Sequence, residues 1–135
     1  MSEIQTSLDL LVEPFRGQIR GLLAEAMERR AYFVVTETLR TYERQQYLFE
    51  NGKTRTLKGN HLIGKAIDVA PVKLYDLNSE LVGKVRELGL SEEDKKLPSW
   101  VVLGELAVKW GVGWGGCKKG KWANFEDFPH LEFLG

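Results

Sequence analysis

Two short segments that hold the chain's two histidines constrain its fold and function more than any other feature. Residues 58–71 contain His61 and Asp68, and His130 lies near the end of the chain. The residues around Asp68 alternate like those of a β-strand, and their flanks are too apolar for an exposed edge. An ionised carboxylate there is costly unless it meets a cation or several hydrogen-bond donors. Metal binding is therefore the first hypothesis for Asp68.

The two histidines complete a ligand set of the type found in zinc enzymes. Catalytic zinc keeps three protein ligands and one open position, and imidazole nitrogens and carboxylate oxygens both suit it. His61, Asp68 and His130 supply such a set. These residues can meet only if the strand carrying His130 lies beside the strand carrying Asp68, so the hypothesis also predicts that pairing. The alternative is that each histidine is a hydrogen-bonded structural residue, and spacing alone leaves both interpretations open.

Three further charged residues are candidates for roles beside such a site. Asp127 precedes His130 by three residues across a Phe-Pro turn, so its carboxylate can reach the open side of a metal and act as general base and acid. Arg40 can hold a substrate carboxylate or a developing oxyanion, or it is an ordinary surface arginine paired with a nearby glutamate. Glu132 either orients His130 as a hydrogen-bond acceptor or faces solvent.

Periodicity and capping signals predict an alternation of helices and strands. We expect helices at residues 15–27 after Pro14, at 43–51 after a Thr41 cap, and at 99–110 between a Ser99 cap and Gly111; residues 79–88 can form another. We expect strands at residues 32–38, 65–70 and 130–134. Gly64 permits a turn or a close backbone approach between His61 and its strand.

The composition indicates one domain, residues 1–135, and excludes several classes of protein. The formal net charge is zero, with 19 Lys+Arg against 19 Asp+Glu, so nothing suggests a nucleic-acid footprint or a polybasic membrane anchor. No apolar run approaches the ~20 residues of a membrane helix, and the first residues lack a secretory signal. We expect a monomer made in the cytoplasm without a signal peptide. The single cysteine, Cys117, excludes an internal disulfide and is expected to be an exposed loop thiol rather than an inhibitory metal ligand.

Residues 110–122 combine glycines with three tryptophans around a basic tip. Glycines let a backbone approach a ligand closely, and the indoles of Trp114 and Trp122 can build rigid walls of a binding site. The alternative is a glycine-rich hairpin whose tryptophans cap the core. The pattern does not separate the two.

The motifs together resemble a known enzyme family. They are His-x-x-Gly-x-Ala-x-Asp at residues 61–68, Trp-Gly-Gly at 114–116, Asp-x-Pro-His-x-Glu at 127–132 and a strand ending at Arg40 followed by a helix with Gln45. The pattern is similar to that of the zinc D-alanyl-D-alanine carboxypeptidase and L-alanyl-D-glutamate peptidase family, peptidase family M15. It especially resembles the short endolysin-type members carried by bacteriophages.

The resemblance implies a small α+β domain of the hedgehog/D,D-peptidase type, in which an antiparallel sheet flanked by helices carries a zinc site. It implies that His61, Asp68 and His130 bind Zn²⁺, that Asp127 is the general base and acid, and that Arg40 binds substrate or the oxyanion. Gln45, Trp114 and Trp122 are further expected substrate contacts, and Glu132 and Asn60 are expected outer partners of the site.

The implied activity is hydrolysis of the L-alanyl-D-glutamate bond in the stem peptide of peptidoglycan, as in a phage lysin released by a holin-type route or carried in a virion. A D-alanyl-D-alanine carboxypeptidase is the alternative enzyme, and a non-catalytic zinc-binding module is the alternative from another class. Two departures bear on this. Gly59 stands where the family has serine, so a hydrogen bond of the site is either missing or made by Asn60. Residues 117–121 lengthen the loop before Trp122.

Overall fold

A computed structural model describes residues 4–52, 59–74, 90–117, 122 and 126–135. The possible helix at residues 79–88 and the basic tip of the glycine-tryptophan segment, residues 118–121, lie outside these ranges. Among the described residues, no helix has both the length and the apolar character needed to cross a membrane.

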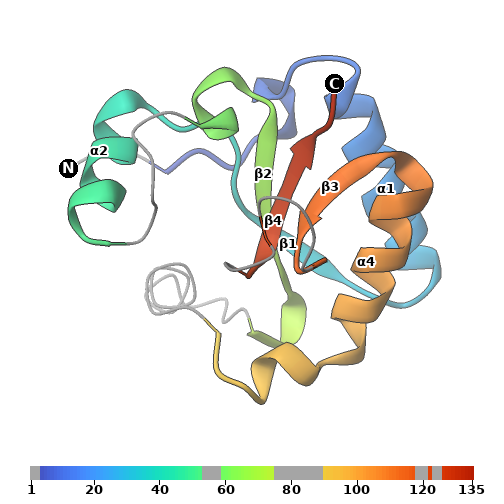
Figure 1. Ribbon diagram of the computed structural model, residues 1–135. Helices are drawn as coiled ribbons and strands as arrows, with labels where there is room; N and C mark the ends of the chain where they lie inside the picture. The colour runs from blue at the N-terminus through green and yellow to red at the C-terminus, as the bar shows by residue number, and fades with distance from the viewer. Residues whose placement is uncertain (1–3, 53–58, 75–89, 118–121, 123–125) are drawn as a thin grey trace.

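The centre of the molecule is a four-stranded sheet in the order β1-β2-β4-β3, and every pairing is antiparallel. The strands are β1 (Phe33–Glu37), β2 (Ala66–Pro71), β3 (Val112–Gly115) and β4 (Asp127–Phe133). The expected α+β architecture is therefore confirmed. The predicted neighbourhood of β2 and β4 is confirmed as well, and these two strands form the middle of the sheet (Figure 1).

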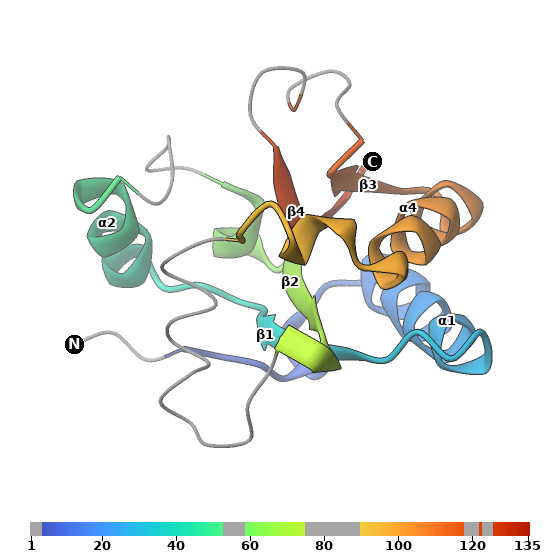
Figure 2. The ribbon, with the colours of Figure 1, turned by 90° about the horizontal axis from the view of Figure 1, so that it is seen from below.

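Three helices flank the sheet in the described part of the chain: α1 (Phe15–Glu28), α2 (Tyr42–Glu50) and α4 (Pro98–Trp110). Helices α1 and α4 lie together on one side of the strands, and α2 lies apart from them on the other side (Figures 1 and 2). Thr41 caps α2 as predicted, because its side chain accepts a hydrogen bond from the backbone N–H of Arg44. Gly111 ends α4 in the left-handed conformation, as its position predicted.

The predicted N-cap of α4 is wrong by two residues, and the predicted start of the last strand is wrong by three. Helix α4 begins at Pro98, with Leu97 rather than Ser99 at the N-cap. Proline fits the first helical position because it has no N–H to leave unpaired and its φ is preset. Strand β4 begins at Asp127 rather than His130 and includes Pro129. Pro129 lies near an irregularity in the β3–β4 register, where a missing backbone donor disturbs the ladder least.

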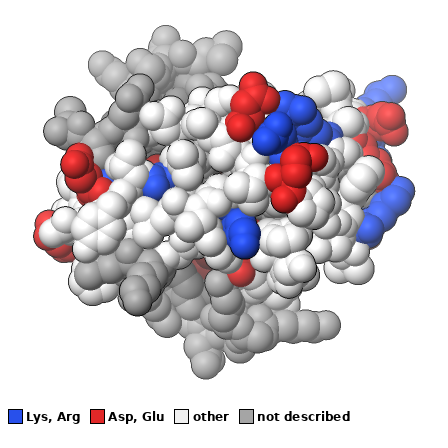
Figure 3. All heavy atoms as spheres, turned by 90° about the horizontal axis from the view of Figure 1, so that it is seen from above, with Lys and Arg blue, Asp and Glu red and all other residues white. Residues whose placement is uncertain are grey.

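Apolar side chains from α1, α4 and the facing side of the sheet form the core. Its largest buried members include Phe15, Ile19, Trp100, Leu103 and Leu131. Ion pairs join α1 to α4 at the surface, with Arg29 2.6 Å from Glu105 and Lys109 2.7 Å from Glu25. Basic and acidic side chains are interspersed on the face that Figure 3 shows. The exposed position predicted for Cys117 is confirmed.

Gly64 serves both purposes that its place in the sequence allowed. It closes the 3-10 turn Asn60–Ile63 with a φ of 71°, in the left-handed region. A Cβ at this position would lie 2.8 Å from the carbonyl oxygen of Leu10, and the Gly64 carbonyl accepts a 3.0 Å hydrogen bond from the N–H of Val12. The N-terminal segment therefore packs directly against the turn that carries His61.

We expect Gly64→Ala to lower the free energy of unfolding by about 1–3 kcal/mol, measured by chemical denaturation, because alanine meets both backbone strain and a clash there. Gly52→Ala is the matched control. Gly52 has a similar φ of 69° but open space around its Cα, so only the strain applies. Equal losses for the two variants would contradict the close approach at Gly64.

Candidate metal centre

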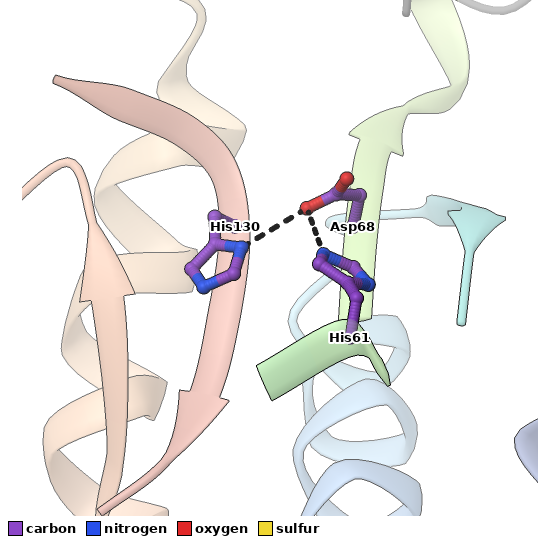
Figure 4. Close-up of side chains that lie close together, drawn as sticks. All are labelled: His61, Asp68 and His130. Carbon is purple, nitrogen blue, oxygen red and sulfur yellow. Dashed lines mark hydrogen bonds and ion pairs between the residues drawn. The ribbon is translucent and has the colours of Figure 1, made fainter. Parts of the chain in front are cut away.

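Two neighbouring strands and one short turn bring the three predicted metal ligands together. Asp68 of β2 and His130 of β4 are directly paired across the sheet, so their side chains lie on the same face. His61 comes from the 3-10 turn Asn60–Ile63 that precedes β2. The three side chains converge on one point, as Figure 4 shows. The structure thus brings His130, which is distant in the sequence, next to His61 and Asp68. Spacing along the chain alone could not place it there.

The distances between the candidate ligand atoms suit a tetrahedral metal ion. Asp68 Oδ1 lies 3.3 Å from His61 Nε2 and 3.3 Å from His130 Nδ1. Zinc bonds of about 2.0–2.1 Å in tetrahedral geometry separate neighbouring ligand atoms by about 3.3–3.4 Å. All three ligand atoms lie within 4.8 Å of one another. We call His61, Asp68 and His130, which were found among the described residues, the metal-type cluster. The residues present therefore fit a divalent metal with mixed nitrogen and oxygen ligands.

The outer hydrogen bonds of the two histidines leave the correct nitrogen facing the site. His61 Nδ1 donates to the backbone carbonyl of Thr38 at 2.8 Å, because a carbonyl can only accept. His130 Nε2 donates to the carboxylate of Glu132 at 2.7 Å. In each ring the nitrogen opposite the donor is left to bind a metal. Of the two interpretations of Glu132, the orienting acceptor is the one that the structure contains.

The charged groups of this cluster shift one another's pKa values. Burial opposes ionisation of Asp68, but the charge of His61 and hydrogen bonds from both histidines outweigh it and hold the pKa of Asp68 well below its ordinary value. Burial likewise opposes protonation of His130, yet hydrogen bonds to Asp68 and Glu132 raise its pKa to about 9. Without a metal, the cluster therefore holds a proton where a cation would bind.

Asp127 lies beside the cluster without belonging to it. Its Oδ2 is 4.0 Å from His130 Nδ1, and its side chain remains 41% exposed. Partial burial and the negative charge of Asp68 raise the pKa of Asp127 to about 6, against the opposing effects of His130, His61 and Arg40. The backbone of Asp127 packs so closely on Gly115 that a Cβ there would collide with it. The second residue of the Trp-Gly-Gly motif thus lets β3 approach β4 at Asp127.

Arg40 is buried beside Asp68 and is not a surface arginine. Its Nη2 lies 2.7 Å from Glu37 Oε1 and 3.5 Å from Asp68 Oδ2. Its Nη1 donates to Gln45 Oε1 at 2.9 Å, and its backbone N–H donates to the carbonyl of His61 at 2.8 Å. Arg40 thereby connects helix α2 and strand β1 to the metal-type cluster.

Two buried charged residues at this site were not identified from the sequence. Glu37 Oε2 lies 3.2 Å from Arg44 Nε, and both side chains are almost completely buried, with 3% and 4% exposed. A glutamate among the β-branched and aromatic residues of a predicted strand is the signal that could have drawn attention to Glu37. No comparable feature of the sequence distinguished Arg44 from the other polar residues of its predicted helix.

The remaining predicted residues take different places. Gln45 is 1% exposed and accepts from Arg40, and the hydrogen bonds shown for Asn60 run through its backbone carbonyl. Trp114 donates to the carbonyl of Phe128 and packs against the core. Trp122 lies beside the cluster, with its ring centroid 6.1 Å from that of His130. Their substrate and outer-partner roles stay predictions.

Comparison with known proteins assigns the chain to a family. A family model described as D-alanyl-D-alanine carboxypeptidase, of the M15 peptidases, matches residues 52–133. This match covers more than half of the chain and both histidine motifs. The chain belongs to peptidase family M15.

Two M15 relatives bear names that specify the bond they cut. The chain is 27% identical over 127 residues to the L-alanyl-D-glutamate peptidase of Listeria phage A118, covering 94% of this chain and 39% of that protein. It is 30% identical over 125 residues to the peptidoglycan L-alanyl-D-glutamate endopeptidase CwlK of Bacillus subtilis, covering 84% of this chain and 68% of that protein. The M15 chain thus spans about two fifths of the phage relative.

Solved structures share the M15 fold seen here. The L-Ala D-Glu endopeptidase ChiX of Serratia marcescens aligns with a TM-score of 0.60 at 25% identity, over 93% of this chain and 81% of that one. The vancomycin-resistance D,D-pentapeptidase VanY, solved in complex with Zn(II), aligns with a TM-score of 0.55 at 14% identity, over 100% of this chain and 80% of that one. At that identity the second likeness concerns the fold alone.

Proposed function

We propose that this M15 chain is a zinc-dependent peptidoglycan hydrolase that cleaves the L-alanyl-D-glutamate bond of the stem peptide. The observation that carries the proposal is the His61, Asp68 and His130 cluster, whose spacing suits tetrahedral zinc, with the Asp127 carboxylate at its side. The names of the two relatives and of the Serratia structure support the choice of bond. A role in phage lysis, or as a lysin carried in a virion, is part of the proposal and is supported by the phage relative.

In the proposed reaction, the metal supplies a Lewis acid that polarises the scissile carbonyl and makes a bound water more acidic. The protein residues do the rest. His61, Asp68 and His130 would hold the ion, with the rings fixed by Thr38 and Glu132. Asp127 accepts the proton of the attacking water and later returns one to the leaving amine. A carboxyl with a pKa of about 6 is ionised at neutral pH and still basic enough for this exchange.

Arg40 is proposed to stabilise negative charge next to this centre. Its guanidinium is permanently charged and lies beside Asp68, and its Nε is buried with no hydrogen-bond partner in the described structure. A substrate carboxylate or the developing oxyanion would be an acceptor for such a cation. Trp122, 8% exposed and beside His130, is proposed as a wall of the substrate site. Gln45 and Trp114 are further proposed substrate contacts, and Asn60 is a proposed outer partner of the site.

Digestion of purified peptidoglycan tests the activity. Zinc-loaded protein should release new L-alanine carboxyl ends and matching D-glutamate amino ends, detected by mass spectrometry, and chelation should abolish the release until zinc is restored. The description of the matching family model favours a D-alanyl-D-alanine carboxypeptidase as the second candidate. Release of free D-alanine would support that candidate. Tight zinc binding with no product of either kind would favour a zinc-binding module.

Zinc affinity should increase with pH, because zinc must displace the proton that His130 holds below its pKa of about 9. We expect the dissociation constant to fall by about tenfold per pH unit between pH 6.5 and 8.5, for one proton released. Competition with a chromophoric chelator measures this. Glu132→Gln should flatten the dependence, since it replaces a charged acceptor that raises the pKa of His130 with a neutral amide. A pH-independent affinity would contradict the assignment of His130.

A further inference from the structure

A buried carboxylate that the proposed reaction does not use lies one strand away from the metal-type cluster. Glu37 is the last residue of β1, and both of its carboxylate oxygens are engaged by arginines. Oε1 lies 2.7 Å from Arg40 Nη2, and Oε2 lies 3.2 Å from Arg44 Nε. A buried ion pair of this kind is weak evidence for stability, because desolvation offsets much of the attraction. Its geometry therefore calls for another explanation.

An irregularity in β1 places Glu37 opposite Asp68. Val35 pairs with Val69, but the next residue of β2, Asp68, pairs with Glu37 rather than with Thr36. One extra residue in β1 thus shifts the register at this step, and such bulges re-aim side chains beside functional sites. Paired residues of antiparallel strands share a face, so Glu37 and Asp68 both reach toward Arg40.

The contacts of Arg40 leave its guanidinium little freedom. Glu37 holds Nη2 from β1 and Gln45 holds Nη1 from α2, while Asp68 Oδ2 lies 3.5 Å from the same Nη2. Arg44, 4% exposed, engages the far oxygen of Glu37, so the orientation of that carboxylate is itself set by α2. The planar guanidinium is therefore clamped from two elements before any substrate is present.

We propose that Glu37 is a positioning residue that acts through Arg40, holding the guanidinium at the orientation needed beside the Asp68 side of the cluster. This inference rests on the proposed hydrolase function, because the group being positioned is the proposed substrate or oxyanion arginine. Glu37 itself touches no reacting atom. Arg44 fixes the orientation of the Glu37 carboxylate, and the β1 bulge brings Glu37 to the site.

The first test is Glu37→Gln, which keeps the size of the side chain and removes its charge. We expect kcat/KM for stem-peptide cleavage to fall by about 10- to 100-fold with zinc content unchanged, since small misplacements of catalytic groups cost on the order of 100-fold. In an Arg40→Lys background the same substitution should change the rate less than about twofold, because the group through which Glu37 acts is already lost. Glu105→Gln, which breaks the exposed pair with Arg29, is the matched control and should leave the rate unchanged.

A second measurement does not depend on activity. In the zinc-loaded wild-type protein, the Arg40 guanidinium should give a resolved ¹H–¹⁵N side-chain signal with slow hydrogen exchange, and Glu37→Gln should speed that exchange by at least about tenfold. Glu37→Asp, which keeps the charge but withdraws the carboxylate, serves the same purpose if the glutamine variant does not fold. An inactive wild-type protein with this signal would overturn the proposed function and leave the clamp in place.

The proposal is overturned by any of three results. Glu37→Gln could keep wild-type kcat/KM, it could lower the rate by the same factor with and without Arg40, or it could leave the exchange of the Arg40 signal unchanged. The second result would show that Glu37 has only a general structural effect, because independent effects multiply.

Discussion

Replacing Asp127 by asparagine is expected to lower kcat for stem-peptide cleavage by about 10²–10⁴-fold while zinc stays bound. Asparagine has the same shape but cannot accept the proton of the attacking water. The metal should remain because Asp127 Oδ2 lies 4.0 Å from the nearest candidate ligand nitrogen, His130 Nδ1, and none of the three converging ligand atoms is its own. The measurements are the initial rate at saturating substrate and the zinc content of the purified variant.

The neighbouring carboxylate provides a matched control for this experiment. Glu126 precedes Asp127 in the chain, its Oε2 lies 3.8 Å from Lys95 Nζ, and it is not a member of the metal-type cluster. Glu126→Gln removes one negative charge from the same segment and should retain nearly the full rate. If Asp127→Asn retained it too, Asp127 would not be the general base, and an acid-base group would have to come from elsewhere.

Removal of Asp68 should have the second large effect, on metal binding as well as activity. Its Oδ1 is the one atom that lies 3.3 Å from both histidine nitrogens, so Asp68→Ala removes the centre of the ligand set. Loss of an outer partner of a metal ligand typically costs about 10- to 100-fold in affinity. We expect Asp68→Ala to weaken zinc binding by more than about 100-fold and to abolish detectable cleavage, with Glu132→Gln giving a smaller loss.

Thermal unfolding separates this loss of metal from a general loss of structure. A ligand that binds only the folded state raises the unfolding temperature, so a chelator should lower it for the wild-type protein. The same chelator should not change the unfolding temperature of Asp68→Ala. Asp9→Asn, which affects an exposed pair with Arg20, should respond to chelation like the wild type. A chelator response retained in Asp68→Ala would exclude Asp68 as a ligand.

The candidate ligands could be predicted from the sequence because their chemistry is local. Two histidines and a carboxylate among apolar residues leave few ways to avoid an uncompensated buried charge. That argument also required β2 and β4 to be neighbours, and the structure confirms that they are paired at Asp68 and His130. The turn at Gly64 could also be predicted, since it depends on the φ of that residue, whereas the close approach of Leu10 to it is a contact between distant segments.

The burial of Arg40 and its contacts could not be predicted from local sequence. Its strand-to-helix position was evident, but its burial and its contact with Asp68 depend on how β1 pairs with β2. Likewise, the glycine-tryptophan pattern could not separate a ligand wall from a core cap. The structure puts Trp114 against the core and Trp122 beside His130, and the substrate role of both indoles stays a prediction.

The sequence by itself determined which groups are candidates to bind a cation, three helices and three of the four strands around them, and which known family the motifs resemble, because residue chemistry and short-range periodicity are properties of neighbouring residues. Strand β3 was not predicted. Only the tertiary structure decided that Glu37 and Arg44 are buried with Arg40 and that Gln45 is enclosed. These facts follow from strand register, from one bulge in β1 and from the docking of α2. Each of them is set by contacts between segments that are distant in the chain or by a shift of one residue, which leaves no mark in local pattern.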